Sequence, residues 1–452
     1  MMRGVSNAVV PALVLLAGLF ASLLFQNSLA DQAAKNVTSL DAITLAQSDA
    51  GDKQSAVPSL RADDFVAVEE VPDPIHIPEP EYPHSALLAG IEGTVWLRVM
   101  IDTSGQVVDA VIEKESGQGA GFEDAAIQAA YWGRWSPAIL RERPVECWVA
   151  YKVEFKIMAN DYITEADKLF KSREYDKSRE IYMKAMEKAT EDGQNSELTE
   201  SYSQIARCYL ITDKKEEGRV WITKAAEIAT PDEPLGWSRY LGVRGRFEWQ
   251  DEELEKATAT FKEMYEYCSG QKLHDRAIDA AHMVAITGSP EQQVEWGLKG
   301  IKEAEAGNVT GWLGPLWNNL GATYETLMRY DDALNAYIKA REYHWQYGTE
   351  TNKMIADWAV GHAYRLAGNY DEAAKWLRPV LAWCERIENA EFVGWSHKEL
   401  GEIDIINKNF KSALEHLVIA EDKLKAEQMP EWDPDGYKKL LGQIEELKSR
   451  VE

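Results

Sequence analysis

The sequence predicts an α+β module, a small antiparallel sheet with one covering helix, followed by an all-α superhelix of repeated helical hairpins. Two observations lead to this prediction. Between residues 94 and 157, apolar and polar residues alternate with the period of two expected of strands with one buried face. From Asn160 onward, apolar residues recur at helical spacing, and the pattern repeats about every 40 residues. The 452-residue chain is long enough for both parts.

Alternation outlines the strands of the module. In the first strand the inward residues are Val95, Leu97, Val99 and Ile101, and the outward residues are Thr94, Trp96, Arg98 and Met100. A turn at residues 102–105, in which Gly105 can take a positive φ, leads to a second strand at 107–115. A helix follows, whose apolar face is predicted to consist of Phe122, Ala125, Ala126, Ala129 and Trp132. This face is expected to cover the hairpin.

The last strand of the module, residues 147–157, has the clearest alternation. Its inward residues are Cys147, Val149, Tyr151, Val153, Phe155 and Ile157, and its outward residues include Trp148, Ala150, Lys152 and Glu154. The strand therefore presents a mixed polar face on its outer side.

Residues 71–158 resemble the C-terminal domain of TonB-type energy transducers. The resemblance rests on Tyr82-Pro83, on residues 90–95 and 101–107, on residues 135–138 (Trp-Ser-Pro-Ala), and on residues 143–145 (Arg-Pro-Val) before the final strand. In that family the domain lies in the periplasm and grips outer-membrane transporters by pairing an extended segment with the edge of its small sheet. The resemblance implies the same strand addition here, in which main-chain hydrogen bonds supply affinity.

The resemblance makes the strand at 147–157 the candidate edge, with Trp148, Ala150, Lys152 and Glu154 as its partner-binding residues. The alternative is an ordinary solvated face, because lysine on an edge strand commonly blocks unwanted pairing.

Residues 1–30 have the composition of an export signal. Arg3 is followed by an apolar run at 8–25, and Ser28-Leu29-Ala30 fits a cleavage site. Eighteen apolar residues span about 27 Å of helix, against roughly 30 Å of hydrocarbon in a bilayer. A cleaved signal and an inner-membrane anchor are therefore both open, and in either case the rest of the chain is expected to be exported and periplasmic. Residues 31–70 are expected to be a flexible linker, much shorter than the proline-rich spacer of the transducers.

Residues 160–430 resemble tetratricopeptide repeats. Trp317, Leu320, Gly321 and Tyr324, followed by Ala333, Tyr337 and Ala340, match the pattern of that family. Gly321, Gly361 and Gly401 are expected to be the small residues where the two helices of a hairpin cross, and equivalent positions upstream are Ala281, Gly245, Ala206 and Ala166. About seven hairpins are predicted, with residues 435–452 as a capping helix. Stacked hairpins of this kind form a concave groove.

The resemblance places peptide ligands on the first helices of the hairpins. The predicted groove residues are Arg207, Arg246, His282, His362, Arg365 and Lys398. In an acidic chain, such a basic stripe favours a partner with carboxylates. The alternative is that these cations pair with neighbouring acidic residues of the chain itself.

Composition and motifs argue against several functions. A formal charge of −26 disfavours nucleic acid as a partner. No metal-binding spacing of histidines and no glycine-rich phosphate loop is found, and the paired acidic residues lie where helices start, so no catalytic residue, metal or cofactor is predicted. The four cysteines are expected to be buried thiols, although a disulfide is possible in an oxidising compartment.

The sequence thus predicts a non-enzymatic protein of the cell envelope that binds proteins. In one hypothesis it is a TonB-like energy transducer, or an accessory for outer-membrane transport, whose partners are an outer-membrane transporter and an inner-membrane motor. In the other it is a periplasmic scaffold for the subunits of an envelope complex, and the TonB-like domain only docks or forms a homodimer.

Overall fold

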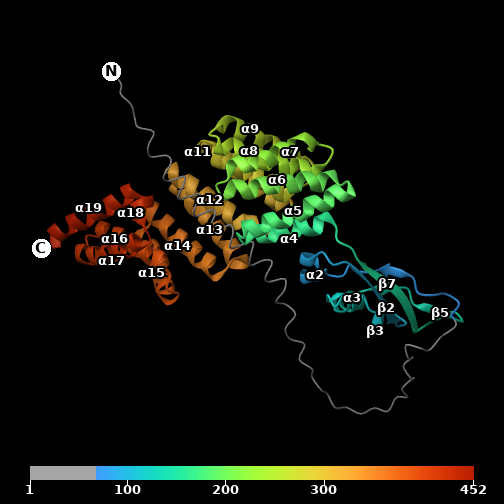
Figure 1. Cartoon of the computed structure of the whole chain (residues 1–452). Helices are drawn as coiled ribbons and strands as arrows, with labels where there is room; N and C mark the ends of the chain where they lie inside the picture. The colour runs from blue at the N-terminus through green and yellow to red at the C-terminus, as the bar shows by residue number, and fades with distance from the viewer. Residues whose placement is uncertain (1–67, 452) are drawn as a thin grey trace, which may run out of the picture. The chain divides into compact units, whose positions relative to one another are not determined.

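The computed structural model describes residues 68–451 (Figure 1). The predicted export signal or anchor and almost all of the predicted linker lie outside these residues. The chain divides into two compact units, which are described separately. One contains the module with the residues up to Phe170 and Tyr175–Cys208, and the other contains Lys171–Glu174 and the residues from Tyr209 onward.

The module has a three-stranded antiparallel sheet in the order β3-β2-β7. Its strands are β2 (Gly93–Ile101), β3 (Val107–Lys114) and β7 (Cys147–Phe155). The central residue Val99 lies opposite Ala110 of β3 and Val149 of β7. The helix α3 (Phe122–Tyr131) contacts β2 and β3, and the buried residues of these elements form one core. The predicted small sheet with a covering helix is confirmed.

Short elements complete the module. They are α2 (His84–Ala89) and two strand pairs, β1 (Pro74–His76) with β4 (Arg134–Trp135) and β5 (Ala138–Leu140) with β6 (Arg143–Val145). Glu70, at the end of the predicted linker, exchanges backbone hydrogen bonds with Ile139 of β5. The predicted turn is present, and Gly105 has a φ of +82° there. A Cβ at Gly105 would lie 1.9 Å from the carbonyl oxygen of Trp135, so the close approach also requires glycine.

Two side chains of the module differ from the predicted pattern. Trp132 was expected on the covering face of the helix, but it follows the end of α3 and is 72% exposed. At about 100° per residue, it points about 120° away from the centre of the face formed by Phe122, Ala126 and Ala130. Met100 was expected on the outward face of the strand, but it is only 4% exposed. It lies opposite Trp148 of β7, whose large ring is on the same face.

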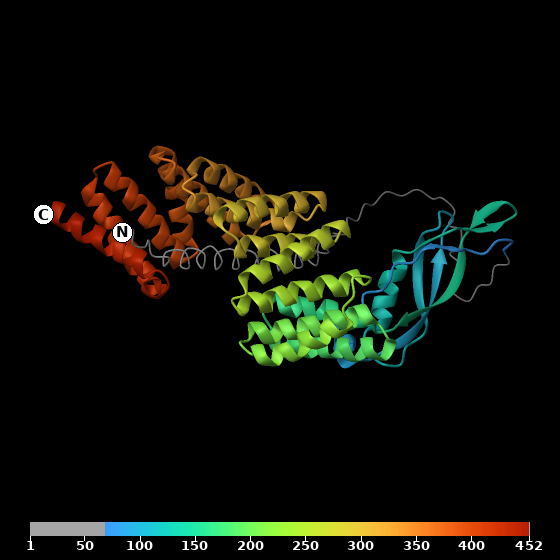
Figure 2. The ribbon, with the colours of Figure 1, turned by 90° about the horizontal axis from the view of Figure 1, so that it is seen from above.

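The rest of the described chain is all α, which confirms the predicted repeat array. Its helices in chain order are α4 (Ala159–Lys171), α5 (Tyr175–Asp192), α6 (Asn195–Ile211), α7 (Lys215–Ile228), α8 (Pro234–Gln250), α9 (Leu254–Gly270), α10 (His274–Thr287), α11 (Pro290–Ala306), α12 (Leu313–Thr326), α13 (Tyr330–Tyr347), α14 (Glu350–Leu366), α15 (Tyr370–Arg386), α16 (Ala390–Ile406), α17 (Phe410–Ala426), α18 (Met429–Trp432) and α19 (Pro434–Val451), with a 3₁₀ turn η2 (Thr310–Trp312) before α12. From α8 to α17, successive helices contact each other, and they can be followed from yellow to red in Figures 1 and 2.

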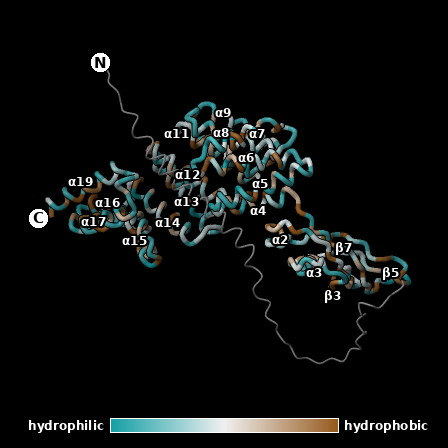
Figure 3. Tube along the Cα trace, in the orientation of Figure 1, coloured by the Kyte–Doolittle hydropathy of each residue, from teal (hydrophilic) through white to brown (hydrophobic). Residues whose placement is uncertain are grey.

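The predicted crossing points are confirmed at the glycines of this array. A Cβ at Gly321 would come within 2.7 Å of the ring of Tyr337, and one at Gly361 within 2.8 Å of Leu377. In each case the contacting residue lies 16 positions after the glycine, on the second helix of the hairpin. Hydrophobic and hydrophilic residues alternate along the labelled helices in Figure 3, as expected of helices that bury one face.

Candidate protein-interaction site

The strand β7 lies at an edge of the three-stranded sheet. Its antiparallel partner among the described residues is β2, from Ile101 opposite Cys147 to Gly93 opposite Phe155, while β3 pairs with the other side of β2. In an antiparallel pair, residues that bond to the partner strand alternate with residues whose N–H and C=O groups point away. About every second residue of β7 therefore presents both backbone groups at the edge, which is the geometry that strand addition needs.

The four predicted edge residues point away from the core. Ala150, Lys152 and Glu154 are exposed and Trp148 is half-buried, whereas Val153 and Phe155 between and beyond them are buried. The outer face thus has an apolar end at Trp148 and a charged end.

Apolar side chains continue from this strand onto the same face of β2. Trp148 lies opposite Met100, and Lys152 lies opposite Trp96, whose side chain is 40% exposed. A strand added beside β7 would place alternate side chains next to this surface. Neighbouring aromatic side chains on one face of a sheet contribute roughly 0.2–1 kcal/mol for each favourable pair.

The charged end of the strand is an ion pair on the surface. Lys152 Nζ donates to Glu154 Oε1 at 2.5 Å, and this hydrogen bond lowers the pKa of the Glu154 carboxyl group. Both side chains are exposed, and such pairs contribute little to stability. A partner strand can therefore replace this contact easily.

The helix α2 of the module contacts the first helical pair of the array within the same unit. Lys184 of α5 donates to the carbonyl oxygen of Leu88 at 2.6 Å. Nδ1 of His84 lies 3.5 Å from Glu165 Oε1 on α4.

The six predicted groove residues all lie half-buried on the first helices of the pairs. Arg207, on α6, lies in the same unit as the module, and its guanidinium group is 4.7 Å from the ring centroid of Phe170. The other five lie in the second unit. They fall into two groups, on α8 and α10 and on α14 and α16.

In the first group, Arg246 is paired with an acidic residue. Its Nη2 donates to both carboxylate oxygens of Asp279, at 2.7 and 3.0 Å, and its Nη1 donates to the carbonyl oxygen of Gly242 at 2.9 Å. His282 lies close to both charges. Burial lowers its pKa, against the opposing effect of Asp279, so it is neutral at pH 7.

In the second group, His362, Arg365 and Lys398 share buried carboxylates. Glu399 is 1% exposed, and it lies 3.0 Å from His362 Nδ1 and accepts hydrogen bonds from Arg365. Glu402 lies 2.8 Å from Arg365 Nη1 and 3.1 Å from Lys398 Nζ. Burial alone would lower the pKa of His362, but the carboxylates of Glu399 and Glu325 outweigh burial and raise it to about 10. His362 is therefore a cation at pH 7.

Acidic residues of the chain itself thus neutralise most of the predicted basic stripe. Arg246, His362, Arg365 and Lys398 each have a carboxylate partner, and His282 is uncharged at pH 7. These contacts are those expected if the cations pair with acidic residues of the chain itself. A role in binding a partner with carboxylates stays a prediction.

Sequence reasoning did not single out a row of tryptophans near the second group. The ring of Trp358 stacks on His362, with centroids 4.9 Å apart and 10° between the planes. Trp395 lies 6.3 Å from Trp358, and Trp432 lies 6.1 Å from Trp395. The signal in the sequence was the tryptophan content, 16 residues in the chain, most of them after residue 230.

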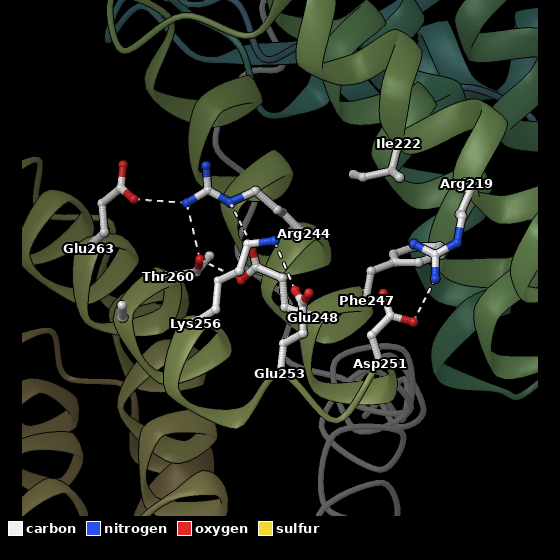
Figure 4. A pocket seen from close by; sticks show the side chains of 11 residues that line it. Arg219, Ile222, Arg244, Phe247, Glu248, Asp251, Glu253, Lys256, Thr260 and Glu263 are labelled. Atoms are coloured by element: carbon white, nitrogen blue, oxygen red, sulfur yellow. Dashed lines mark hydrogen bonds and ion pairs between the residues drawn. The ribbon is translucent and has the colours of Figure 1, made fainter.

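A cavity of about 560 Å³ lies among α7, α8 and α9 (Figure 4). On one side Arg244 donates to Thr260 at 3.2 Å, and Thr260 donates to the buried Glu248 at 2.6 Å. On the other side Arg219 donates to Asp251 at 2.5 Å. The lining carries charges of both signs that already pair with one another, so it does not select a ligand by charge.

Three further observations bear on the predictions. Among residues 68–451, no group of three or more His, Cys, Asp or Glu side chains is placed to hold a metal ion. The four cysteines form no disulfide, and burial raises the pKa of Cys268 and of Cys384 to about 12, so their thiols are protonated at pH 7. In the described part of the chain, no helix combines the length and the apolar character needed to cross a bilayer.

Comparison with known proteins agrees with this division of the chain. Residues 78–157 match the family model of the Gram-negative bacterial TonB protein C-terminal domain. Protein tonB2 of Pseudomonas aeruginosa is 39% identical over 85 residues, which are 18% of this chain and 30% of that protein. The match therefore spans less than a third of the relative's length.

The helical part is similar in fold to solved repeat structures. A STAND signal-transduction ATPase with a tetratricopeptide repeat sensor from Pyrococcus horikoshii aligns with a TM-score of 0.51 and 15% identity, over 64% of this chain and 44% of that one. The C-terminal part of a TPR repeat-containing protein from Cytophaga hutchinsonii aligns with a TM-score of 0.42 and 15% identity, over 62% and 99% of the two chains. Residues 78–157 thus match the TonB C-terminal family model, and the helices that follow are similar in fold to a tetratricopeptide-repeat structure.

Proposed function

We propose that this chain is a non-enzymatic protein of the cell envelope that works by binding other proteins, as a TonB-like energy transducer or an accessory for outer-membrane transport. The observation that supports this most directly is the open edge of β7 in a domain that matches the TonB C-terminal family. The tetratricopeptide-like fold of the remaining helices suits a second protein-binding surface.

In this proposal an extended segment of a transporter pairs with β7. The strand is nine residues long, and its outward-directed N–H and C=O groups receive main-chain hydrogen bonds from the segment. Each such bond contributes on the order of 1 kcal/mol net. Trp148, Ala150, Lys152 and Glu154 would contact the side chains of the segment and set its preference.

Proline substitution at two adjacent positions tests this contact. The N–H groups of consecutive strand residues point to opposite sides, so of Val149→Pro and Ala150→Pro one removes a bond to β2 and the other removes only a donor at the free edge. Circular dichroism and thermal melting identify the variant that stays folded. Pull-downs from envelope extract with wild type and that variant should differ in the captured outer-membrane transporter. If the folded variant retains every partner, strand addition at β7 is wrong.

The proposal also requires export and, for energy transduction, a link to the inner membrane. Fractionation with an antibody to the array separates the cases. A protein held in the inner-membrane fraction that cross-links to a motor complex supports a transducer, because force from a membrane motor needs a tether.

A second candidate function is a periplasmic scaffold. The length of the helical array favours it, because the helices α4 to α19 make up most of the chain and the TonB-like domain only a small part. In this case the domain docks to a complex or forms a homodimer. A mature protein released into the periplasmic fraction, whose partners all persist when residues 78–157 are deleted, would support the scaffold and exclude the transducer.

A further inference from the structure

A second cavity, of about 310 Å³, lies along α15. Its lining consists of Asp357, Lys375, Trp376, Pro379, Val380 and Trp383, and we call it the tryptophan groove. Asp357 comes from α14, and the other five residues come from consecutive turns of α15. The groove lies within the second unit, and none of its residues belongs to the predicted sites.

The tryptophan rings of the groove are held in place by neighbours on α13. The guanidinium group of Arg341 lies 4.8 Å from the ring centroid of Trp345 and 5.0 Å from that of Trp376. Arg341 Nε donates to Asp357 Oδ1 at 2.5 Å, which fixes the cation between the rings. The ring of Trp345 also contacts that of Trp383, with centroids 6.3 Å apart. A ligand therefore meets a surface that is already ordered, which favours binding.

The groove offers hydrogen-bond donors on an apolar surface. The indole N–H groups of Trp376 and Trp383 have no acceptor among residues 68–451, and both side chains are partly exposed. Between them lie Pro379 and Val380, which are apolar. An indole N–H can only donate a hydrogen bond, so these two groups call for acceptors on the ligand.

The charges around the groove are already compensated. Asp357 is paired with Arg341, and Lys375 Nζ donates to Glu372 at 2.5 Å. An uncharged ligand leaves both pairs intact. A neutral, apolar ligand that is rich in acceptors therefore suits the groove.

The spacing of the two tryptophans indicates how long a segment of the ligand they can contact. Trp376 and Trp383 are seven positions apart, which places both on one face of α15 and about 10.5 Å apart along the helix axis. One turn of a polyproline II helix is three residues and about 9 Å long. Two prolines three positions apart can therefore lie against the two rings at once.

We propose that the tryptophan groove binds a proline-rich segment of a partner protein in the polyproline II conformation. Proline has no N–H group and leaves its carbonyl oxygens free, so such a segment supplies acceptors without donors that would need to be satisfied. Its rings are apolar and its conformation is preformed, and aromatic-lined grooves are the usual receptors for it. The indoles of Trp376 and Trp383 donate to carbonyl oxygens of the segment while its prolines pack on their faces.

The test uses the full chain labelled with 5-fluorotryptophan, and N-acetyl-deca-proline amide as the probe. Titration followed by ¹⁹F NMR should show saturable shifts of the signals that disappear in Trp376→Phe and in Trp383→Phe. Trp383→Phe keeps an aromatic face but lacks the N–H, and it should weaken binding about fivefold, as expected for one lost neutral hydrogen bond. Trp383→Ala should weaken it more than tenfold. Circular dichroism checks that each variant stays folded.

Matched controls make the outcome decisive. Trp132→Phe changes an exposed tryptophan of the module and should leave the affinity within about twofold. A Gly-Ser decapeptide, which has no preformed conformation, should cause no saturable shift. The proposal is overturned if deca-proline at millimolar concentration shifts no groove signal, if Trp383→Ala binds it as wild type does, or if chitotriose or p-cresol binds there and deca-proline does not.

Discussion

The ammonium group of Lys184 donates a hydrogen bond of 2.6 Å to the carbonyl oxygen of Leu88. Leu88 lies in the last turn of α2, where carbonyl groups have no partner within the helix and attract cations. This contact joins the TonB-like domain to α5. Nδ1 of His84, also in α2, lies 3.5 Å from Glu165 Oε1 of α4, so α2 contacts both helices of the first pair.

Lys184→Met should therefore loosen the domain from the first helical pair. The change keeps most of the apolar stem but removes a charged donor, at a cost of about 1–2 kcal/mol. Faster hydrogen exchange in residues 84–92, measured by mass spectrometry, is the expected sign. Lys339→Met is the matched control, because Lys339 pairs with Glu342 on its own helix, α13, and lies outside the unit that contains the domain. Equal exchange in both variants would show that the Lys184 contact does not hold the domain.

Glu399 is expected to be among the most sensitive residues of the array. Burial would raise its pKa, but His362 and Arg365 outweigh burial and hold the pKa far below its usual range. Glu399→Gln leaves both cations without their shared carboxylate and should lower the free energy of unfolding by about 3 kcal/mol. Glu372→Gln, which breaks only the exposed pair with Lys375, should change it by less than about 0.5 kcal/mol. Urea unfolding of the two variants gives the comparison.

The same cluster predicts a loss of stability at alkaline pH. The folded-state pKa of His362 is raised to about 10, above its ordinary value, so the folded state binds the proton more tightly than the unfolded state. This stabilisation is complete below about pH 6.5 and disappears as the pH rises through 10. Urea midpoints measured from pH 7 to pH 10.5 should fall for wild type and fall less for His362→Gln. If the urea midpoints of the two proteins fell in parallel with pH, a group other than His362 would cause the alkaline loss of stability.

Burial of His344 leads us to expect a loss of stability in acid. It is buried against Gly314, and burial lowers its pKa to about 4. The unfolded state then binds the proton more tightly, so stability falls as the pH drops from about 6.5 toward 4, by about 3 kcal/mol in all. Thermal melting of wild type and His344→Gln between pH 7 and pH 4.5 checks this. A wild-type slope that the substitution leaves unchanged would exclude His344 as its source.

The sequence predicted those features that depend on neighbouring positions along one strand or helix. Alternation identified the inward set Val95, Leu97 and Val99, and the 40-residue repeat identified Gly321 and Gly361 as crossing points. Each of these follows from a fixed period, two for a strand and 3.6 for a helix. The edge position of β7 was expected only from the family resemblance, because which of the described strands pair with β7 is a property of the folded sheet.

Contacts between residues distant in sequence could not be predicted in this way. The six basic positions lie on the first helices, but the acidic partners of Arg246, His362 and Arg365 lie 33 to 37 positions away, on a neighbouring repeat. Nothing in a local pattern determines such a pairing. The tryptophan groove was missed for the same reason, since Arg341 of α13 orders a ring on α15.

A final prediction compares two glycines inside helices. In Gly321→Ala the new Cβ would lie 2.7 Å from the ring of Tyr337, which is buried and cannot withdraw. The hairpin would have to open slightly, at about 1–3 kcal/mol. Gly442 of α19 has nothing within 4 Å of a Cβ, so Gly442→Ala meets no obstacle and should stabilise the protein by about 1 kcal/mol through helix propensity. Urea unfolding should thus show opposite signs for the same chemical change. Two substitutions of the same sign would mean that the contact at Gly321 does not limit the approach of α12 and α13.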